Sequence, residues 1–459
     1  MSKKRIYLNA FDMNCAGHQS PGLWSHPEDQ SHRYKDSEYW IELAKILERG
    51  RFDAIFLADV LGIYDVYEDS RDAAVKQGAQ VPVNDPMLVV PLMAQVTKHL
   101  GFGVTVSTSY DQPYAFARSM STLDHLTKGR VGWNIVTSYL NSAAINLGLD
   151  KQISHDTRYE IAEEFLDVCY KLWEGSWEDD AVTLDKKNRL YTDPTKVHNI
   201  DHKGEYFNVI GPHLTEPSPQ RTPVIYQAGA SKRGRNFAAK HAECVFISSP
   251  TKRIAEKYVK QLREETKKVG RDENEIKVFS LFTPIVATTQ EEAEAKYEEY
   301  KSYSSYEGGL ALLGGWTGID LSSYEPDEEL RYIKNEAIHS AVEIFTKIDP
   351  DKKWTVKEVA EFVGVGGIGP VAVGSPERVA DIMEEWIEDT GVDGFNIAYA
   401  ITPGTFEDFV DLVIPVLQER GLVQKEYQEE TLRGNLTGSS QLPLSHPGKQ
   451  YHRSLQKSL

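Results

Sequence analysis

The sequence predicts an α/β fold in which eight strand–helix units close into a (β/α)₈ TIM barrel, with insertions after strands 4 and 7. Two observations predict this fold. Short apolar strands alternate with amphipathic helices along most of the 459 residues. The strands are apolar almost throughout, as expected of parallel strands that are buried on both faces. An open doubly wound sheet is the second choice, because its cofactor-binding turn is missing from the expected place.

The predicted units follow one another in regular order, and several helices carry clear end signals. Gly50 ends the first helix, whereas Ser375 and Pro376 open a later one. The strands are expected at residues 6–11, 52–60, 102–109, 131–138, 223–229, 244–249, 277–287 and 395–400. The helices are expected at residues 39–50, 86–101, 115–129, 159–175, 231–242, 251–269, 375–391 and 405–421.

The domain organisation is predicted to be a single barrel over residues 1–436. Two long stretches interrupt the alternation, at about 176–222 and 289–370. The second is expected to act as a lid, because long barrel loops often gate active sites. Residues 437–459 are polar and turn-rich, and they are expected to form a flexible C-terminal tail.

Composition narrows the classes of function and the compartment. The net charge of −18 repels phosphate backbones, so we expect no nucleic-acid partner. Cys15, Cys169 and Cys244 are few, odd in number and far apart, which is typical of a reducing compartment. The sequence shows neither a secretory signal nor an apolar stretch of about 18 residues. We therefore expect a soluble, cytoplasmic protein with no membrane span.

Two short motifs are interpreted as structural rather than functional. The run GVGGIG at 364–369 spells GxGxxG, but Pro370 follows it where a dinucleotide site needs a helix. We interpret the run as a flexible glycine linker. Cys15 and His18 have C-x-x-H spacing, but two ligands do not make a zinc site, and no metal is expected.

Polar side chains gather at the predicted C-terminal strand ends, which meet in one mouth of a barrel. Asn134 lies within the fourth strand, which ends in Thr137 and Ser138. Such groups either satisfy buried backbone or face a ring with carbonyl and N–H edges. After the fifth strand, a turn containing Gly229 and Ser231 opens a helix whose free N–H groups can hold a phosphate. The fifth strand also supplies Gln227, and the first three strand ends supply Cys15, His18, Asp59, Tyr64 and Ser107.

These motifs resemble the bacterial luciferase-like superfamily, in the branch of the nitrilotriacetate, dibenzothiophene-sulfone and long-chain alkane monooxygenases. The stretches that carry the resemblance include RFDAIFLADVLGIYDVY (51–67), STLDHLTKGRVGWNIVTS (121–138) and EPSPQRTPVIYQAGASKRGRNFAAKHAECVF (216–246). NAFDMNCAGH (9–18) and IYDVYEDSRDAAV (63–75) are most similar to the long-chain alkane enzyme.

The resemblance implies a cofactor and the residues that hold it. Family members use reduced FMN (FMNH2), which a separate flavin reductase supplies. By position, Asp59, Ser107, Asn134 and Thr137 correspond to residues at the isoalloxazine. Tyr159, Ser231 and the backbone of Ala230 correspond to the FMN phosphate site. From the alkane enzyme, the catalytic or substrate-pocket candidates are Cys15, His18, Tyr64 and Gln80, and Tyr139 stands where that enzyme has a histidine.

The resemblance also implies the reaction. We expect a two-component monooxygenase that inserts one oxygen atom from O2, through a C4a-(hydro)peroxyflavin, into a long-chain alkane or related small molecule. Organosulfur or aminopolycarboxylate substrates are the alternative in the same branch. A non-catalytic flavin-binding protein and a deazaflavin-dependent dehydrogenase are alternatives of other classes. His18 is the first candidate for moving protons, because imidazole titrates near pH 6.5. A homo-oligomer, dimer or tetramer, is also expected.

Overall fold

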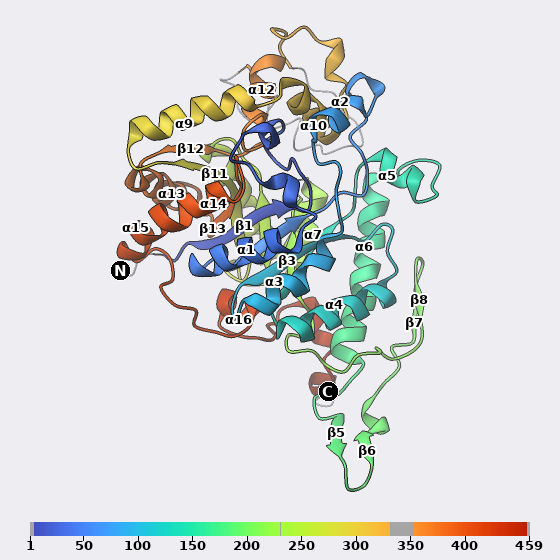
Figure 1. The fold of residues 1–459 in the computed structure, drawn as a ribbon. Coiled ribbons are helices and arrows are strands. Elements are labelled where there is room, and N and C mark those ends of the chain that lie inside the picture. The colour runs from blue at the N-terminus through green and yellow to red at the C-terminus, as the bar shows by residue number, and fades with distance from the viewer. Residues whose placement is uncertain (1–3, 230, 331–352, 457–459) are drawn as a thin grey trace.

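The computed structural model describes residues 4–229, 231–330 and 353–456 (Figure 1). Its centre is a barrel of parallel strands in the order β1–β2–β3–β4–β9–β10–β11–β13, and β13 pairs with β1 to close the ring. The predicted (β/α)₈ fold is confirmed. The barrel strands are β1 (Tyr7–Met13), β2 (Ala54–Ala58), β3 (Gly101–Ser107), β4 (Val131–Val136), β9 (Val224–Gln227), β10 (Cys244–Ile247), β11 (Lys277–Val286) and β13 (Gly394–Ile397).

Every expected strand overlaps an observed one, because each is an apolar run between turn signals. The barrel sheet contains one further strand among the described residues, β12 (Val371–Gly374), which was not predicted. It pairs in parallel with the second half of β11, from Thr283 to Val286. The residues that follow Pro370 therefore extend the sheet.

Helices surround the barrel and return the chain to the start of each next strand. Pro113 begins the helix after β3, and Lys128 ends it in the left-handed conformation at φ 57°. The barrel helices are α1 (Ser37–Arg49), α3 (Val90–Val96), α4 (Pro113–Thr127), α6 (His155–Tyr170), α7 (Lys232–His241), α8 (Lys252–Lys268), α13 (Pro376–Thr390), α14 (Gly404–Asp408) and α15 (Ile414–Glu419). Smaller helices are α2 (Asp72–Gln77), α5 (Asn141–Asn146), α16 (Leu432–Thr437) and α17 (Arg453–Gln456).

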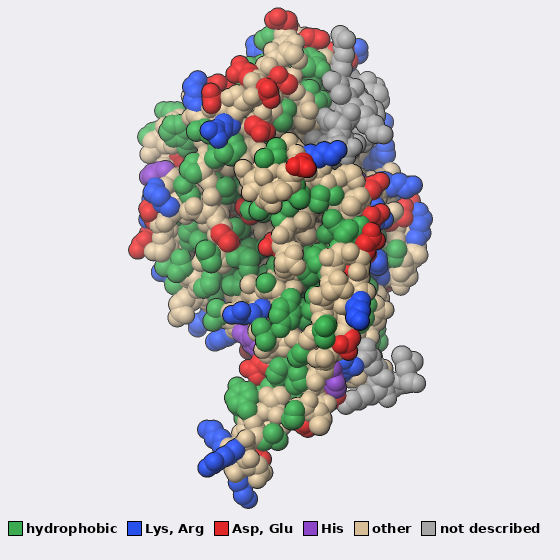
Figure 2. All heavy atoms as spheres, turned by 90° about the vertical axis from the view of Figure 1, so that its right-hand side faces the viewer, with side chains coloured by type: hydrophobic (Ala, Val, Ile, Leu, Met, Phe, Trp, Pro, Cys, Tyr) green, Lys and Arg blue, Asp and Glu red, His purple; other side chains and the backbone are tan. Residues whose placement is uncertain are grey.

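The first insertion lies between α6 and β9 and forms two hairpins. These are β5 (Val182–Asp185) with β6 (Leu190–Thr192), and β7 (His202–Lys203) with β8 (Asn208–Val209). The β5–β6 hairpin projects from the body of the molecule (Figure 1). Figure 2 shows basic side chains at the end of this projection, where the turn contains Lys186, Lys187 and Arg189.

The second insertion lies between β11 and α13. Its described helices are α9 (Gln290–Tyr303), α10 (Tyr306–Thr317) and α12 (Val356–Val363). Capping boxes begin two of them, at Thr289 with Glu292 and at Thr355 with Glu358. These helices lie together at the end of the molecule opposite the β5–β6 hairpin (Figure 1).

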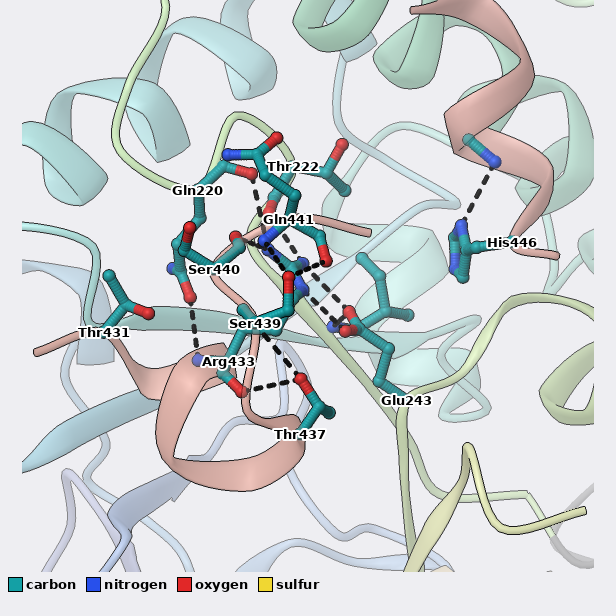
Figure 3. Close-up of polar contacts among 12 residues, drawn as sticks. Gln220, Thr222, Glu243, Thr431, Arg433, Thr437, Ser439, Ser440, Gln441 and His446 are labelled. Carbon is teal, nitrogen blue, oxygen red and sulfur yellow. Dashed lines mark hydrogen bonds and ion pairs between the residues drawn. The ribbon is translucent and has the colours of Figure 1, made fainter. Parts of the chain in front are cut away.

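The C-terminal segment packs against the barrel both before residue 437 and in the described part of the stretch 437–459, where Leu442, His446 and His452 are buried although we expected a flexible tail. Leu432 and Leu436 of α16 join a buried cluster with side chains of the barrel interior. Arg433 is fully buried and forms an ion pair with Glu243, at 2.6 Å from Nε to Oε1 (Figure 3). Further along, His446 is buried and contacts the His241 carbonyl at 2.8 Å. The polar residues of this segment thus have partners on the barrel, which the sequence alone does not reveal.

Among the described helices, none is both long and apolar enough to cross a membrane.

Candidate active site

A cavity of about 340 Å³ opens at the C-terminal ends of the barrel strands. This volume falls within the range of roughly 300–1,000 Å³ that is typical of small-molecule sites. Ten of the side chains that the sequence predicts for the site line this cavity: His18, Asp59, Tyr64, Gln80, Ser107, Asn134, Thr137, Tyr139, Tyr159 and Ser231. With Ile247 of β10 and with Trp316 and Ile368 of the second insertion, residues from six strand ends and from that insertion meet in one place.

Two buried amides face the cavity with unused acceptors. Asn134 donates from Nδ2 to Thr105 Oγ1 at 2.9 Å, so its carbonyl oxygen points elsewhere. Asn134 Oδ1 and Gln227 Oε1 have no hydrogen-bond partner among the described residues, and each side chain is only 3% exposed. A buried acceptor without a partner costs about 1–3 kcal/mol. Both oxygens are therefore suited to a ligand that presents N–H groups.

The turn between β9 and α7 offers free backbone donors. Ser231 is the N-cap of α7, and its hydroxyl accepts from Gly234 N–H at 3.0 Å. The N–H groups of Lys232 and Arg233 open the helix and have no acceptor within it. Tyr159 packs against this turn, since a Cβ on Gly229 would lie 3.0 Å from its hydroxyl. The turn can hold an anion such as a phosphate. Ala230 lies outside the described residues.

Four side chains form a hydrogen-bonded cluster at another part of the wall. The Tyr64 hydroxyl donates to Gln80 Oε1 at 2.8 Å and lies 2.9 Å from the Tyr139 hydroxyl. Trp316 of α10 donates its indole N–H to the same Tyr64 oxygen at 3.2 Å. Sequence reasoning did not identify Trp316, because nothing local to the insertion shows which of its residues reaches the barrel.

His18 is more deeply buried than its sequence position indicates, with 1% exposure. The centroid of its ring lies 4.4 Å from that of the Phe11 ring. Burial lowers the pKa of the imidazole to about 3. Gln19 Nε2 lies 3.1 Å from His18 Nε2 and can only donate, so this ring nitrogen accepts. His18 is therefore neutral near pH 7. The ordinary value of about 6.5, on which its candidacy for moving protons relied, therefore does not describe this buried ring, and the role itself stays a prediction.

Cys15 is the one described candidate that does not line the cavity. The chain turns directly after β1, where Cys15 N–H donates to the Met13 carbonyl at 2.6 Å. The backbone of Cys15 then forms an isolated antiparallel β-bridge with Val83. Burial raises the pKa of the Cys15 thiol well above the usual value. No group of three or more His, Cys, Asp or Glu side chains within the described ranges is arranged to hold a metal ion.

The remaining wall contains charged and aromatic groups. Burial, together with the neighbouring carboxylates of Asp85 and Asp111, raises the pKa of Asp59 to about 7. The rings of Phe11, Phe56 and Phe246 contact one another, with centroids 4.8–5.7 Å apart. All three rings line the cavity. They lie within predicted strands, but the sequence gives no signal that separates them from ordinary core residues.

The glycine run at 364–369 packs against the site and is neither a dinucleotide motif nor a linker. Gly367 has a φ of +70°, and a Cβ there would lie 2.0 Å from Gln19 Oε1. Gly366 donates its N–H to Ser20 Oγ at 3.0 Å. Ile368, between these glycines and β12, lines the cavity. Glycine is required here because the backbone approaches the residues beside His18 closely.

Comparison with known proteins gives close matches over nearly the whole chain. This chain is 52% identical over 451 residues to a dimethyl-sulfide monooxygenase of Hyphomicrobium sulfonivorans, and the match covers 98% of this chain and 94% of the relative. It is equally identical, over 450 residues, to a long-chain alkane monooxygenase of Geobacillus thermodenitrificans, covering 98% of both chains. A crystal structure of a riboflavin lyase, with modified FMN and riboflavin, superposes with a TM-score of 0.92. That structure is 38% identical and covers 98% of this chain and 100% of its own.

Residues 13–394 match the family described as luciferase-like monooxygenase. This range contains the β2, β4 and β9 motifs on which the resemblance depends, and of the residues that line the cavity only Phe11 precedes it. The chain belongs to the luciferase-like monooxygenase family.

Proposed function

We propose that this enzyme uses reduced FMN, supplied by a separate flavin reductase, to insert one oxygen atom from O2 into an uncharged small organic molecule. The observation that carries the proposal is the division of one cavity into a polar part and an apolar part. Unpartnered amide oxygens and a helix N-terminus occupy the polar part. Apolar side chains and the Tyr64 cluster occupy the other.

The polar part fits the chemistry of FMN. Asn134 Oδ1 and Gln227 Oε1 would accept from N–H groups of the isoalloxazine, and Ser107 and Thr137 supply hydroxyls beside them. The start of α7, with Ser231 and Tyr159, would bind the phosphate through backbone N–H groups and hydroxyls. When bound, reduced FMN would supply the electrons that activate O2.

The protein's own contribution is to orient the substrate and to exclude water. The Phe11, Phe56 and Phe246 rings keep their part of the wall dry, and Trp316 and Ile368 close another part from the second insertion. A dry site limits the loss of reactive oxygen species to solvent. The hydroxyl groups of Tyr64 and Tyr139 lie at the wall of the cavity, whereas the buried imidazole of His18 is neutral.

The apolar part favours an uncharged substrate. Leu61, Leu140, Trp316 and Ile368 line it. Among the described residues that line the cavity, Arg158 is the only lysine or arginine, and it belongs to the first turn of α6 beside Tyr159. A substrate with several carboxylates needs paired cations once it leaves water. We therefore favour an alkane or a thioether over an aminopolycarboxylate.

The first test of the proposed function measures turnover. With FMN, NADH, a reductase and ¹⁸O₂, the enzyme should convert an alkane or a thioether to a product carrying one labelled oxygen atom. An aminopolycarboxylate should remain unchanged. Consumption of O2 without any oxygenated product, across the three substrate classes, would support a non-catalytic flavin-binding protein instead.

A matched pair of variants tests the phosphate site. Ser231→Asp keeps an N-cap side chain but places a negative charge where the phosphate binds, whereas Ser231→Thr keeps both the cap and the neutral hydroxyl. Juxtaposed like charges cost several kcal/mol, so Ser231→Asp should weaken FMN binding by roughly 100-fold or more. Ser231→Thr should bind FMN within a few-fold of the unmodified protein. Equal affinities of the two variants would place the phosphate elsewhere.

A further inference from the structure

We propose that the Tyr139 oxygen is a hydrogen-bond acceptor site of the cavity, and that it binds the hydroxyl group of an alcohol. The site follows from counting the hydrogen atoms in the Tyr64 cluster. The choice of an alcohol as the natural ligand rests on the proposed function, since insertion of oxygen into a C–H bond gives a hydroxyl.

The orientation of the Gln80 amide sets the direction of the cluster. Gln80 Nε2 lies 2.8 Å from the His18 carbonyl oxygen. A carbonyl can only accept, so the amide nitrogen must face it and donate. Gln80 Oε1 therefore faces the Tyr64 hydroxyl, at 2.8 Å, and can only accept from it. The single hydrogen of the Tyr64 hydroxyl is used in this bond.

The two other contacts of Tyr64 must then be donated to it. Trp316 Nε1–H has no lone pair to offer and donates at 3.2 Å. The Tyr139 hydroxyl, at 2.9 Å, can form a hydrogen bond only by donating its own hydrogen, because Tyr64 has none left. Burial raises the pKa of Tyr64 to about 12 and that of Tyr139 well above its usual value, so both phenols keep their protons.

The Tyr139 oxygen is left with lone pairs and no hydrogen to offer. Tyr64 has donated once and accepted twice, so its hydrogen-bonding capacity is full. Within the described residues, Tyr139 has no partner other than Tyr64 at its hydroxyl. Its ring lines the cavity beside Leu140 and Tyr64. A ligand that carries an O–H donor can bond to this oxygen, whereas an ether or a thioether cannot.

Two isomeric ligands isolate this property. Hexan-1-ol carries an O–H donor, whereas pentyl methyl ether has the same atoms and only an acceptor. We would measure equilibrium binding of both to the flavin-free protein by calorimetry. One neutral hydrogen bond should make hexan-1-ol bind roughly three- to tenfold more tightly. Because this assay uses neither FMN nor turnover, its failure is distinct from failure of the proposed function.

Two variants should abolish the preference by opposite routes. Tyr139→Phe removes the acceptor, so the affinity for hexan-1-ol should fall to that for the ether. Gln80→Met removes the acceptor of the Tyr64 hydroxyl. The Tyr64 hydroxyl can then donate to the Tyr139 oxygen, so the Tyr139 hydroxyl is free to donate its hydrogen into the cavity. In this variant the affinity for the ether should rise to that for hexan-1-ol.

A control variant separates this effect from general changes in the protein. Tyr114→Phe removes a hydroxyl that donates to the Pro212 carbonyl at 3.3 Å, away from the cavity, and should keep the full preference. Circular dichroism would confirm that each variant is folded. The proposal is overturned if the unmodified protein binds both isomers equally, or if Tyr139→Phe retains the preference for the alcohol.

Discussion

Gly315 of α10 gives the sharpest test of how the second insertion shapes the active site. A Cβ on Gly315 would lie 1.8 Å from Tyr64 Cδ1 and 2.6 Å from Cε1. Carbon atoms cannot approach so closely, and favourable contacts lie near 3.5–4.0 Å. Gly315→Ala must therefore displace the Tyr64 ring. Displacement would separate its hydroxyl from Gln80, Tyr139 and Trp316.

The expected magnitude is the balance of two effects. Alanine stabilises a helix interior by about 1 kcal/mol relative to glycine. The displaced Tyr64 loses three hydrogen bonds of roughly 1 kcal/mol each. The net loss of stability is therefore about 2 kcal/mol. The unfolding entropy of a chain of 459 residues is about 1 kcal/mol per kelvin, so the Tm should fall by roughly 2 °C.

The neighbouring glycine supplies a matched control in the same helix. A Cβ on Gly314 would meet nothing closer than the Ile319 carbonyl oxygen, at 3.3 Å. Gly314→Ala should therefore keep the Tm or raise it by up to roughly 1 °C, from its helix propensity alone. Thermal unfolding followed by circular dichroism measures both variants, and hexan-1-ol binding reports on the cavity.

The two variants should also differ in ligand binding. Gly315→Ala should lose the preference for hexan-1-ol over its ether isomer, whereas Gly314→Ala should retain it. If the two variants show the same Tm and the same preference, α10 does not fix the position of Tyr64. The reasoning that connects the insertion to the active site would then fail.

Three further predictions follow from buried groups. Arg433→Met leaves Glu243 buried without its cation, which should cost about 3–5 kcal/mol in urea unfolding, and Arg433→Met with Glu243→Gln should recover much of this. Since Arg433 lowers the folded-state pKa of Glu243 below its ordinary 4.5, whereas burial alone raises it, the cost should shrink as pH falls toward that lower value and be smallest below it. Asp59→Asn should raise the Tm at pH 8 but not below pH 4. The pKa of Asp59 is about 7 in the folded protein and ordinarily 3.8, so ionisation of this carboxyl destabilises the folded protein as the pH rises from about 4 to 7. Gly367→Ala should lower the Tm, since its φ of +70° strains an alanine by about 1–2 kcal/mol; Gly364→Ala, at φ −61°, is the control and should not.

The barrel could be predicted because its signals are local. Each strand is a short apolar run, and helix signals such as Ser375–Pro376 and Gly50 concern neighbouring residues only. The strand ends of a parallel barrel share one rim, so the groups at Asn134, Thr137 and Ser231 could be assigned to one site. The β12 strand was missed because its four residues follow a glycine run that resembles a linker.

The properties that decide chemistry were not predictable, because they depend on contacts between distant segments. The pKa of His18 follows from burial beside Phe11, and the sequence places both near a strand end without showing that water is excluded. The direction of the Tyr64 cluster needs a carbonyl at residue 18, an amide at residue 80 and an indole at residue 316. No periodicity connects these positions. The hydrogen-bond groups that remain open to the cavity are therefore decided by contacts among segments far apart in the sequence, with Gln80 on one side of Tyr64 and Trp316 of the second insertion on the other.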